Sequence, residues 1–135
     1  MSEGVEATAV FGGGFKAEVS ARGHRVSVDE PVELGGEDIG FMPTELLCAA
    51  LASCFALAMG HVARKREIEV PSLEVTVRAE RAGRELRYER LTIEARADMA
   101  ADALADLVAR AERVCWVSNT LSSGVTFEYR SRPLK

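Results

Sequence analysis

Two neighbouring stretches of the chain alternate between apolar and polar residues, which is the pattern of a β-strand with one buried face. The apolar positions are Leu73, Val75, Val77 and Ala79 in the first stretch, and Leu91, Ile93, Ala95 and Ala97 in the second. A turn at Gly83 separates them, so the pattern predicts an antiparallel hairpin. Shorter alternating segments predict an N-terminal hairpin from strands at 15–20 and 24–29, and a last strand at 125–129.

Between the hairpins, apolar residues occupy every face of a predicted helix that starts at Pro43 and covers 46–62. A helix that is apolar on all sides is a buried one, so we expect a central core helix. Its apolar run, 46–59, is interrupted by Ser53 and is shorter than the roughly 20 residues that a bilayer requires. No membrane association is therefore predicted.

A second, amphipathic helix is predicted at 102–115, where apolar residues recur every three or four positions. The segment 118–124 is rich in serine and reads as a short turn. Strands and helices in this order favour an α+β fold with antiparallel sheets around the central helix. The length of 135 residues suits a single domain, 1–135.

Composition and charge exclude several classes of partner and site. Seventeen basic residues against twenty-one acidic ones give a net charge of −4, and like charges form no block, so nucleic acid is not an expected partner. The N-terminus has no basic segment followed by an apolar one, which predicts a cytoplasmic protein. The three cysteines and two histidines match no zinc spacing, so we expect no metal and no cofactor.

The cysteines are the candidates for chemistry. Cys54 lies within the central helix and Cys115 at the end of the second, while Cys48 faces another side of its helix and is interpreted as structural. Each thiol alone is more simply a small buried hydrophobic group. If Cys54 and Cys115 meet in space, one thiolate could attack a peroxide and the other could close a disulfide.

Two segments of the chain resemble motifs of the OsmC/Ohr superfamily, the osmotically inducible and organic hydroperoxide resistance proteins. The first is Gly-Gly-Glu-Asp-Ile-Gly-Phe-Met-Pro-Thr-Glu-Leu-Leu-Cys-Ala-Ala-Leu-Ala-Ser-Cys at 35–54, and the second is Cys-Trp-Val-Ser-Asn-Thr-Leu at 115–121. Asp29-Glu30-Pro31 before the first motif also fits, so the resemblance covers nearly the whole chain.

The resemblance implies an OsmC-like fold, an intertwined homodimer with sites at the subunit interface, and a thiol-dependent peroxidase acting on organic hydroperoxides in the stress response. Cys54 would match the peroxidatic cysteine of the family and Cys115 the resolving one. Leu47, Leu51, Phe55 and Trp116 are candidates to line an apolar pocket for the substrate. The implied reductant is a lipoyl-type dithiol on another protein.

The sequence departs from the family pattern at the groups that assist the thiol. The family places a glutamate directly after the proline, whereas here Thr44 follows Pro43 and the acid is Glu45. Glu45 is the candidate for the catalytic acid, or is an acid favoured by the helix dipole. Lys16, Arg22 and Arg25 are candidates for the partner arginine of that acid, and Trp116 replaces the usual proline after the second cysteine.

These departures keep two alternatives open. One is a non-catalytic OsmC-like protein that binds a small apolar or thiol-containing molecule. The other is a redox sensor or a structural cysteine pair, for which the thiols would titrate near the ordinary value of about 8.5.

Overall fold

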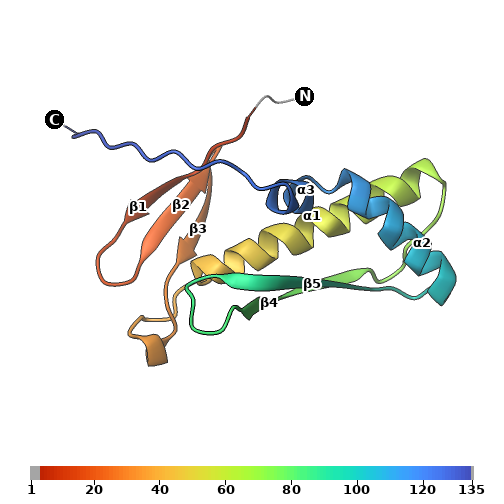
Figure 1. The fold of residues 1–135 in the computed structure, drawn as a ribbon, viewed down its shortest axis with the longest axis horizontal. Helices are drawn as coiled ribbons and strands as arrows, with labels where there is room; N and C mark the ends of the chain where they lie inside the picture. Colours follow the sequence, from red (N-terminus) through yellow and green to blue (C-terminus); the bar gives the residue numbers. More distant parts are fainter. Residues whose placement is uncertain (1–3, 135) are drawn as a thin grey trace. The chain divides into compact units, whose positions relative to one another are not determined.

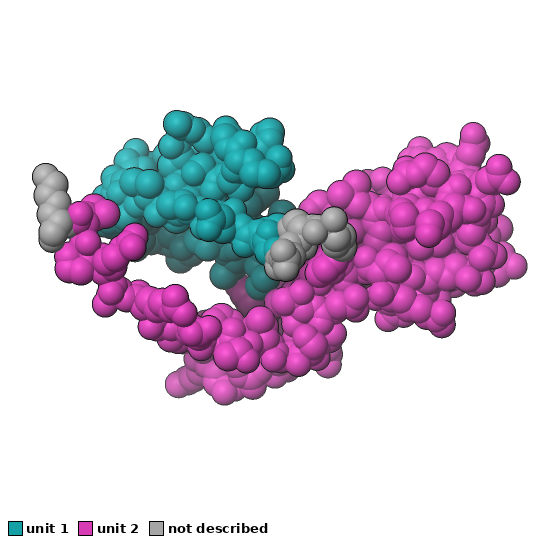
Figure 2. Space-filling model, turned by 90° about the horizontal axis from the view of Figure 1, so that it is seen from above, with its two compact units in different colours: residues 1–49 teal, residues 50–135 magenta. Residues whose placement is uncertain are grey.

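A computed structural model describes residues 4–134, which fall into two compact units. The first unit is Met1–Ala49 and the second is Ala50–Lys135, shown in teal and magenta in Figure 2. Each unit is described separately below. The single domain expected from the sequence remains a prediction.

The first unit contains a three-stranded antiparallel sheet with the order β1-β2-β3 (Figure 1). Strands β2 (Ala17–Ala21) and β3 (His24–Val28) form the predicted N-terminal hairpin, with Val19 opposite Val26. The sequence analysis missed β1 (Thr8–Phe11), which pairs with β2. All four residues of β1 are exposed, so this strand lacks the buried positions that produce an alternating pattern.

A compact loop follows β3 and contains the short 3-10 helix η1 (Val32–Leu34). Asp29 is fully buried, and its carboxylate accepts hydrogen bonds from the backbone N–H groups of Glu30 (2.8 Å), Glu37 (3.0 Å) and Ile39 (3.4 Å). A Cβ atom at Gly36 would lie 1.9 Å from the Glu30 carbonyl oxygen, so only glycine fits there. The buried carboxylate therefore organises the loop that leads into the first long helix.

Helix α1 (Pro43–Lys65) confirms the predicted start at Pro43 but is longer than its apolar run. At 23 residues it is long and apolar enough to cross a membrane, by length and composition only, and the core helix of a soluble protein passes the same test. The expected burial on every face is wrong for the single chain. Phe55 is buried at 1% exposure, whereas Leu57 is 76% exposed, because the chain covers one face of α1 and leaves the other open.

The second unit contains the predicted hairpin of β4 (Glu74–Arg81) and β5 (Tyr88–Arg96), with Val77 opposite Ile93. Helix α2 (Ala101–Ala111) and the 3-10 turn η2 (Glu112–Val114) cover the span predicted as one helix. Apolar side chains of β4, β5 and α2 pack against the buried face of α1. The core residues are Leu51, Phe55, Ala58, Met59, Ala63, Leu107, Ala111 and Cys115. These two antiparallel sheets and the helices confirm the α+β class.

Two predictions near the C-terminus are wrong. The predicted turn at 118–124 is largely the helix α3 (Trp116–Ser122). The predicted strand at 125–129 is extended chain without strand pairing among the described residues, drawn in blue in Figure 1. Phe127 is 72% exposed and Tyr129 91%, and this segment pairs with no strand in the part of the chain that the structure describes.

Candidate active site

The second unit brings Cys54 and Cys115 together, although 61 positions separate them in the sequence. Cys54 lies on α1 and is half-buried against the core cluster to which the fully buried Cys115 belongs. The thiol of Cys54 hydrogen-bonds to the sulfur of Cys115, and both are free thiols. Cys54 is thus the more accessible of the two residues.

Cys115 occupies a break between two helical segments. Its backbone is extended (φ −87°, ψ 107°), after η2 ends at Val114 and before α3 begins at Trp116. This places it at the N-cap of α3, where the first N–H groups of a helix have no partner within the helix. The sequence predicted Cys115 at the end of a continuous helix, which would not have exposed its sulfur to these donors.

The surroundings of Cys115 favour its anionic form. Burial by itself raises the pKa of the Cys115 thiol. Hydrogen bonds from the Ser118 hydroxyl and N–H, the Cys54 thiol and the Val117 N–H outweigh that effect, so the pKa of Cys115 lies below its ordinary value. The site therefore has the means to hold one negative charge on sulfur.

Ser118 is the residue that the sequence analysis missed. Its Oγ lies 3.3 Å from the Cys115 carbonyl oxygen and also within hydrogen-bond reach of the Cys115 sulfur. A hydroxyl has one proton to donate, so the oxygen and the sulfur of Cys115 compete for it. Ser118 could have been found from its position three residues after Cys115, which is about one helical turn, but the sequence analysis predicted a short turn at 118–124 instead of a helix.

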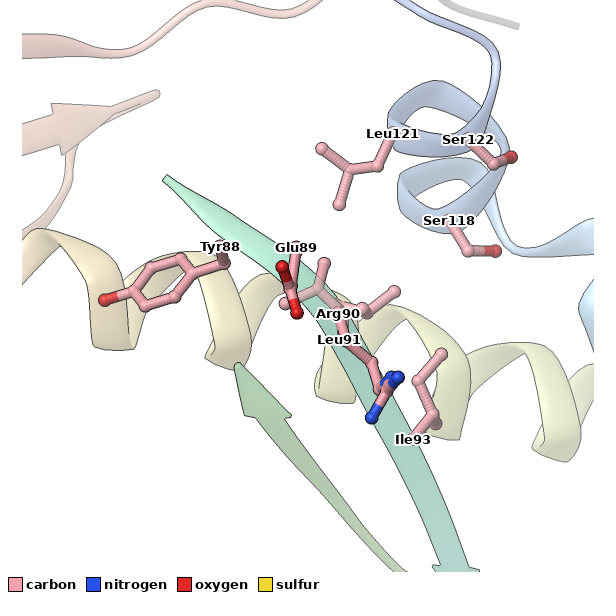
Figure 3. Close-up of a pocket in the computed structure, with 9 residues that line it drawn as sticks. Tyr88, Glu89, Arg90, Leu91, Ile93, Ser118, Leu121 and Ser122 are labelled. Carbon is pink, nitrogen blue, oxygen red and sulfur yellow. The ribbon is translucent and has the colours of Figure 1, made fainter. Parts of the chain in front are cut away.

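A cavity of about 390 Å³ lies between β5 and α3 (Figure 3), and Ser118 is among the residues that line it. Leu121 points from α3 toward β5, and Ser118 belongs to the wall formed by the same helix. The lining residues are Leu51, Tyr88, Glu89, Arg90, Leu91, Ile93, Ser118, Leu121 and Ser122. The lining of the cavity therefore mixes apolar side chains with polar and charged ones.

Of the predicted pocket residues, Leu51 lines this cavity. Phe55 is buried in the core instead, and Leu47 is half-buried in the first unit. Trp116 is 64% exposed and lines a separate depression together with Asn119 and Thr120. Trp116 follows Cys115 directly in sequence but is not among the residues that line the cavity between β5 and α3.

Glu45 and two of the basic candidates, Lys16 and Arg25, have partners within the first unit. The carboxylate of Glu45 accepts a hydrogen bond from the Met42 N–H at 2.8 Å, which caps the start of α1. Lys16 forms an ion pair with Glu37 at 2.6 Å. Arg25 pairs with Glu18 at 3.3 Å, also within the first unit. The structure thus gives Glu45 a capping role, and its catalytic role remains a prediction.

Comparison with known proteins identifies related folds. The sequence model of the family described as OsmC-like protein matches residues 35–130. No curated protein sequence matches the chain significantly. Three solved structures illustrate the similarity.

An osmotic stress induced and detoxification response protein from Psychrobacter arcticus is 21% identical and has a TM-score of 0.74, with 89% of this chain and 90% of that one covered. An organic hydroperoxide resistance protein from Elizabethkingia anophelis is 27% identical with a TM-score of 0.68, covering 89% of each chain. The organic hydroperoxide resistance protein OsmC from Legionella pneumophila is 27% identical with a TM-score of 0.64, covering 87% and 88%.

Proposed function

The chain belongs to the OsmC-like family, within the OsmC/Ohr superfamily, and on this premise we propose that it is a thiol-dependent peroxidase that reduces organic hydroperoxides to alcohols. The observation that carries the proposal is the hydrogen bond between Cys54 and Cys115 within one largely buried cluster. Both thiols are free, as the reduced state of such an enzyme requires. Two structural neighbours are themselves organic hydroperoxide resistance proteins.

The half-buried Cys54 is the peroxidatic residue in this proposal. Its thiolate attacks the distal oxygen of the hydroperoxide, the one that carries the hydrogen, the O–O bond breaks, and the alkoxide leaves and is protonated to an alcohol. The Cys115 thiolate then attacks the sulfur of the Cys54 sulfenic acid. A disulfide forms and hydroxide leaves, to be protonated to water.

The cavity between β5 and α3 is the proposed site for the organic part of the substrate. Leu51, Leu91, Ile93 and Leu121 supply its apolar surface. Such a lining favours a hydroperoxide with an apolar substituent over hydrogen peroxide, since burying apolar area contributes about 25 cal/mol per Å². Glu45, the third proposed site residue, lies at the start of α1.

A dithiol of the lipoyl type is the proposed reductant, acting in the cytoplasm. It attacks one sulfur of the Cys54–Cys115 disulfide, forms a mixed disulfide, and closes its own ring as the second thiolate leaves. Two electrons thus pass from the dithiol to the protein in each cycle.

The first experiment mixes the reduced protein with cumene hydroperoxide and follows peroxide loss and thiol state by mass spectrometry. We expect a Cys54–Cys115 disulfide that is lost in Cys54→Ser and in Cys115→Ser. The matched control is Cys48→Ser, which removes the third free thiol of the chain and should leave the disulfide intact. Thiols that survive a large excess of several hydroperoxides would overturn the proposal and favour the binding-protein alternative.

A homodimer is the proposed assembly, supported by apolar surface that one chain leaves open. Leu57 on α1 is exposed, as are Phe127 and Tyr129 in the alternating segment near the C-terminus. A second copy would cover such residues and supply strand hydrogen bonds to 125–129. Sedimentation of the wild type and of Phe127→Asp tests this, with a dimer expected for the former and a weakened one for the latter. A monomeric wild type at high concentration would refute it.

A further inference from the structure

Helix α3 contributes residues to two hollows of the second unit. One is the cavity between β5 and α3, where Leu121 points toward β5 (Figure 3). The other is the depression that Trp116 lines, which has a volume of about 590 Å³ and shares no lining residue with the first. We call it the η2–α3 depression, and its lining residues are Arg113, Val114, Trp116, Asn119, Thr120 and Ser123. Positions 116, 119, 120 and 123 recur every three or four residues and so form one face of α3.

The η2–α3 depression carries a positive charge. Among the described residues, Arg113 is the charged one that lines it, and no ion pair between described residues involves Arg113. Glu112 precedes Arg113 in the sequence but does not line the depression. Arg110, one turn earlier, is already paired with Asp106 at 2.9 Å. The guanidinium of Arg113 therefore favours a ligand that brings a negative charge.

The hydroxyls that line the depression donate to the backbone. Thr120 Oγ1 donates to the Trp116 carbonyl oxygen at 2.8 Å, and Ser123 Oγ donates to the Thr120 carbonyl oxygen at 3.1 Å. A hydroxyl has one proton, so in this arrangement both can only accept hydrogen bonds from a ligand. The guanidinium of Arg113 and the indole N–H of Trp116 are the donors that the lining offers, together with the side-chain amide of Asn119. An acceptor-only group such as an ionised carboxylate suits these donors.

The remaining lining is apolar and open to solvent. Trp116 is 64% exposed and Val114 is 46% exposed. An indole offers a large flat surface to a ring or an alkyl chain, and a guanidinium binds a carboxylate through two parallel hydrogen bonds. The volume of about 590 Å³ lies within the range of small-molecule sites, roughly 300–1,000 Å³. The depression thus has room for a small molecule with a carboxylate and an apolar body.

We propose that the η2–α3 depression binds a small apolar carboxylate, with the carboxylate on Arg113 and the ring or alkyl chain against Trp116 and Val114. This ligand site is separate from the cavity proposed for the hydroperoxide, and it does not require peroxidase activity. A ligand with an ammonium group would meet the like charge of Arg113. A neutral apolar ligand would forgo the charge-assisted hydrogen bonds, so both classes should bind more weakly.

The test is isothermal titration calorimetry of the full chain at about 0.15 M salt, with 4-phenylbutyrate as the probe and 4-phenylbutanol as its neutral counterpart. We expect the wild type to bind 4-phenylbutyrate at least about tenfold more tightly than 4-phenylbutanol, because only the carboxylate forms charge-assisted hydrogen bonds. In Arg113→Gln this preference should disappear. Trp116→Ala should weaken the binding of both probes.

Arg110→Gln is the matched control. It removes the same charge from the preceding turn, but Arg110 does not line the depression, so the affinity should change by less than about twofold. An equal loss of affinity in Arg110→Gln and Arg113→Gln would overturn the inference, because the attraction would then follow from net charge alone. Arg113 is exposed, so Arg113→Gln should also keep the thermal midpoint of the wild type.

Three other results would overturn the inference. One is a wild type that does not bind 4-phenylbutyrate at millimolar concentration. Another is binding that falls in Leu121→Ala but not in Arg113→Gln, which would place the probe in the cavity between β5 and α3. The third is a homodimer that dissociates in Trp116→Ala when followed by sedimentation, which would show that a second copy covers the depression. The titration contains no peroxide, so its result does not depend on the proposed peroxidase function.

Discussion

Two residues on α1 allow a sharp test of which helix face the chain buries. Phe55 is 1% exposed and Leu57 is 76% exposed, although they are only two positions apart. Replacing a buried phenylalanine with alanine costs about 3–5 kcal/mol, because apolar area is lost and a cavity remains. A fully buried leucine costs about 2–5 kcal/mol, and Leu57 has only about a quarter of its surface covered, so Leu57→Ala should cost roughly 0.5–1 kcal/mol.

The assay is urea unfolding followed by circular dichroism. With a denaturant slope of about 2 kcal/mol per M, Phe55→Ala should lower the midpoint by roughly 2 M and Leu57→Ala by less than about 0.5 M. The pair is measured at two protein concentrations about a hundredfold apart, since a homodimer is stabilised by mass action. A cost of Leu57→Ala that grows with concentration would show that a second copy covers this face. Equal midpoint shifts for the two variants at the lower concentration would refute the assignment of the buried face.

Four further substitutions and one pH series test the fold and the role of Glu45. Gly36→Ala should lower the thermal midpoint by several degrees, because its Cβ would meet a backbone oxygen. Gly60→Ala lies inside α1 with open space around it and should stabilise the protein by about 1 kcal/mol. Calorimetry would contradict this reasoning if both variants shifted the thermal midpoint in the same direction. Glu45→Gln should keep the hydrogen bond from the Met42 N–H and leave the thermal midpoint unchanged, whereas Glu45→Ala should lower the free energy of unfolding by up to about 1 kcal/mol. A peroxidase rate that falls in Glu45→Gln without a change in thermal midpoint would support the catalytic role of Glu45. An unchanged rate would refute that role. Burial raises the pKa of the Asp29 carboxyl, but its backbone hydrogen bonds and the charge of Lys16 lower that pKa by more, so the net pKa lies below its ordinary value. The ionised Asp29 should therefore stabilise the folded state fully above about pH 4, and this stabilisation should be lost as the pH falls through the lowered pKa. Acid unfolding that is the same in Asp29→Asn and the wild type would contradict this.

The sequence pattern correctly predicted the elements whose buried faces pack within a single chain. The alternation at 73–79 and 91–97 specified β4 and β5, because each strand has one face on the core and one in water. Helix α3 was missed because Ser118, Thr120 and Ser122 are typical of turns. In the structure their hydroxyls donate to carbonyl oxygens three or four residues back, which is compatible with a helix.

Elements that depend on distant partners were not predictable in the same way. The alternation at 125–129 indicates a segment suited to pairing, but a sequence pattern does not specify which strand, or which chain, provides the partner. The all-apolar character of α1 likewise predicted burial without showing that one chain covers only part of it. The proximity of Cys54 and Cys115 was implied by the family resemblance and not by spacing, and the contribution of Ser118 required the helix break at Cys115.

The position of Trp116 gives this protein a built-in optical signal. It is the single tryptophan of the chain, it is largely exposed, and it follows Cys115 directly at the start of α3. A change in the charge or bonding of the Cys115 sulfur occurs one residue from this indole, and thiolates and disulfides both quench indole emission. The fluorescence of the unmodified protein should therefore change at each oxidation and reduction step. If the proposed redox cycle operates, it can be timed in this way without a dye, a coupling enzyme or an added label.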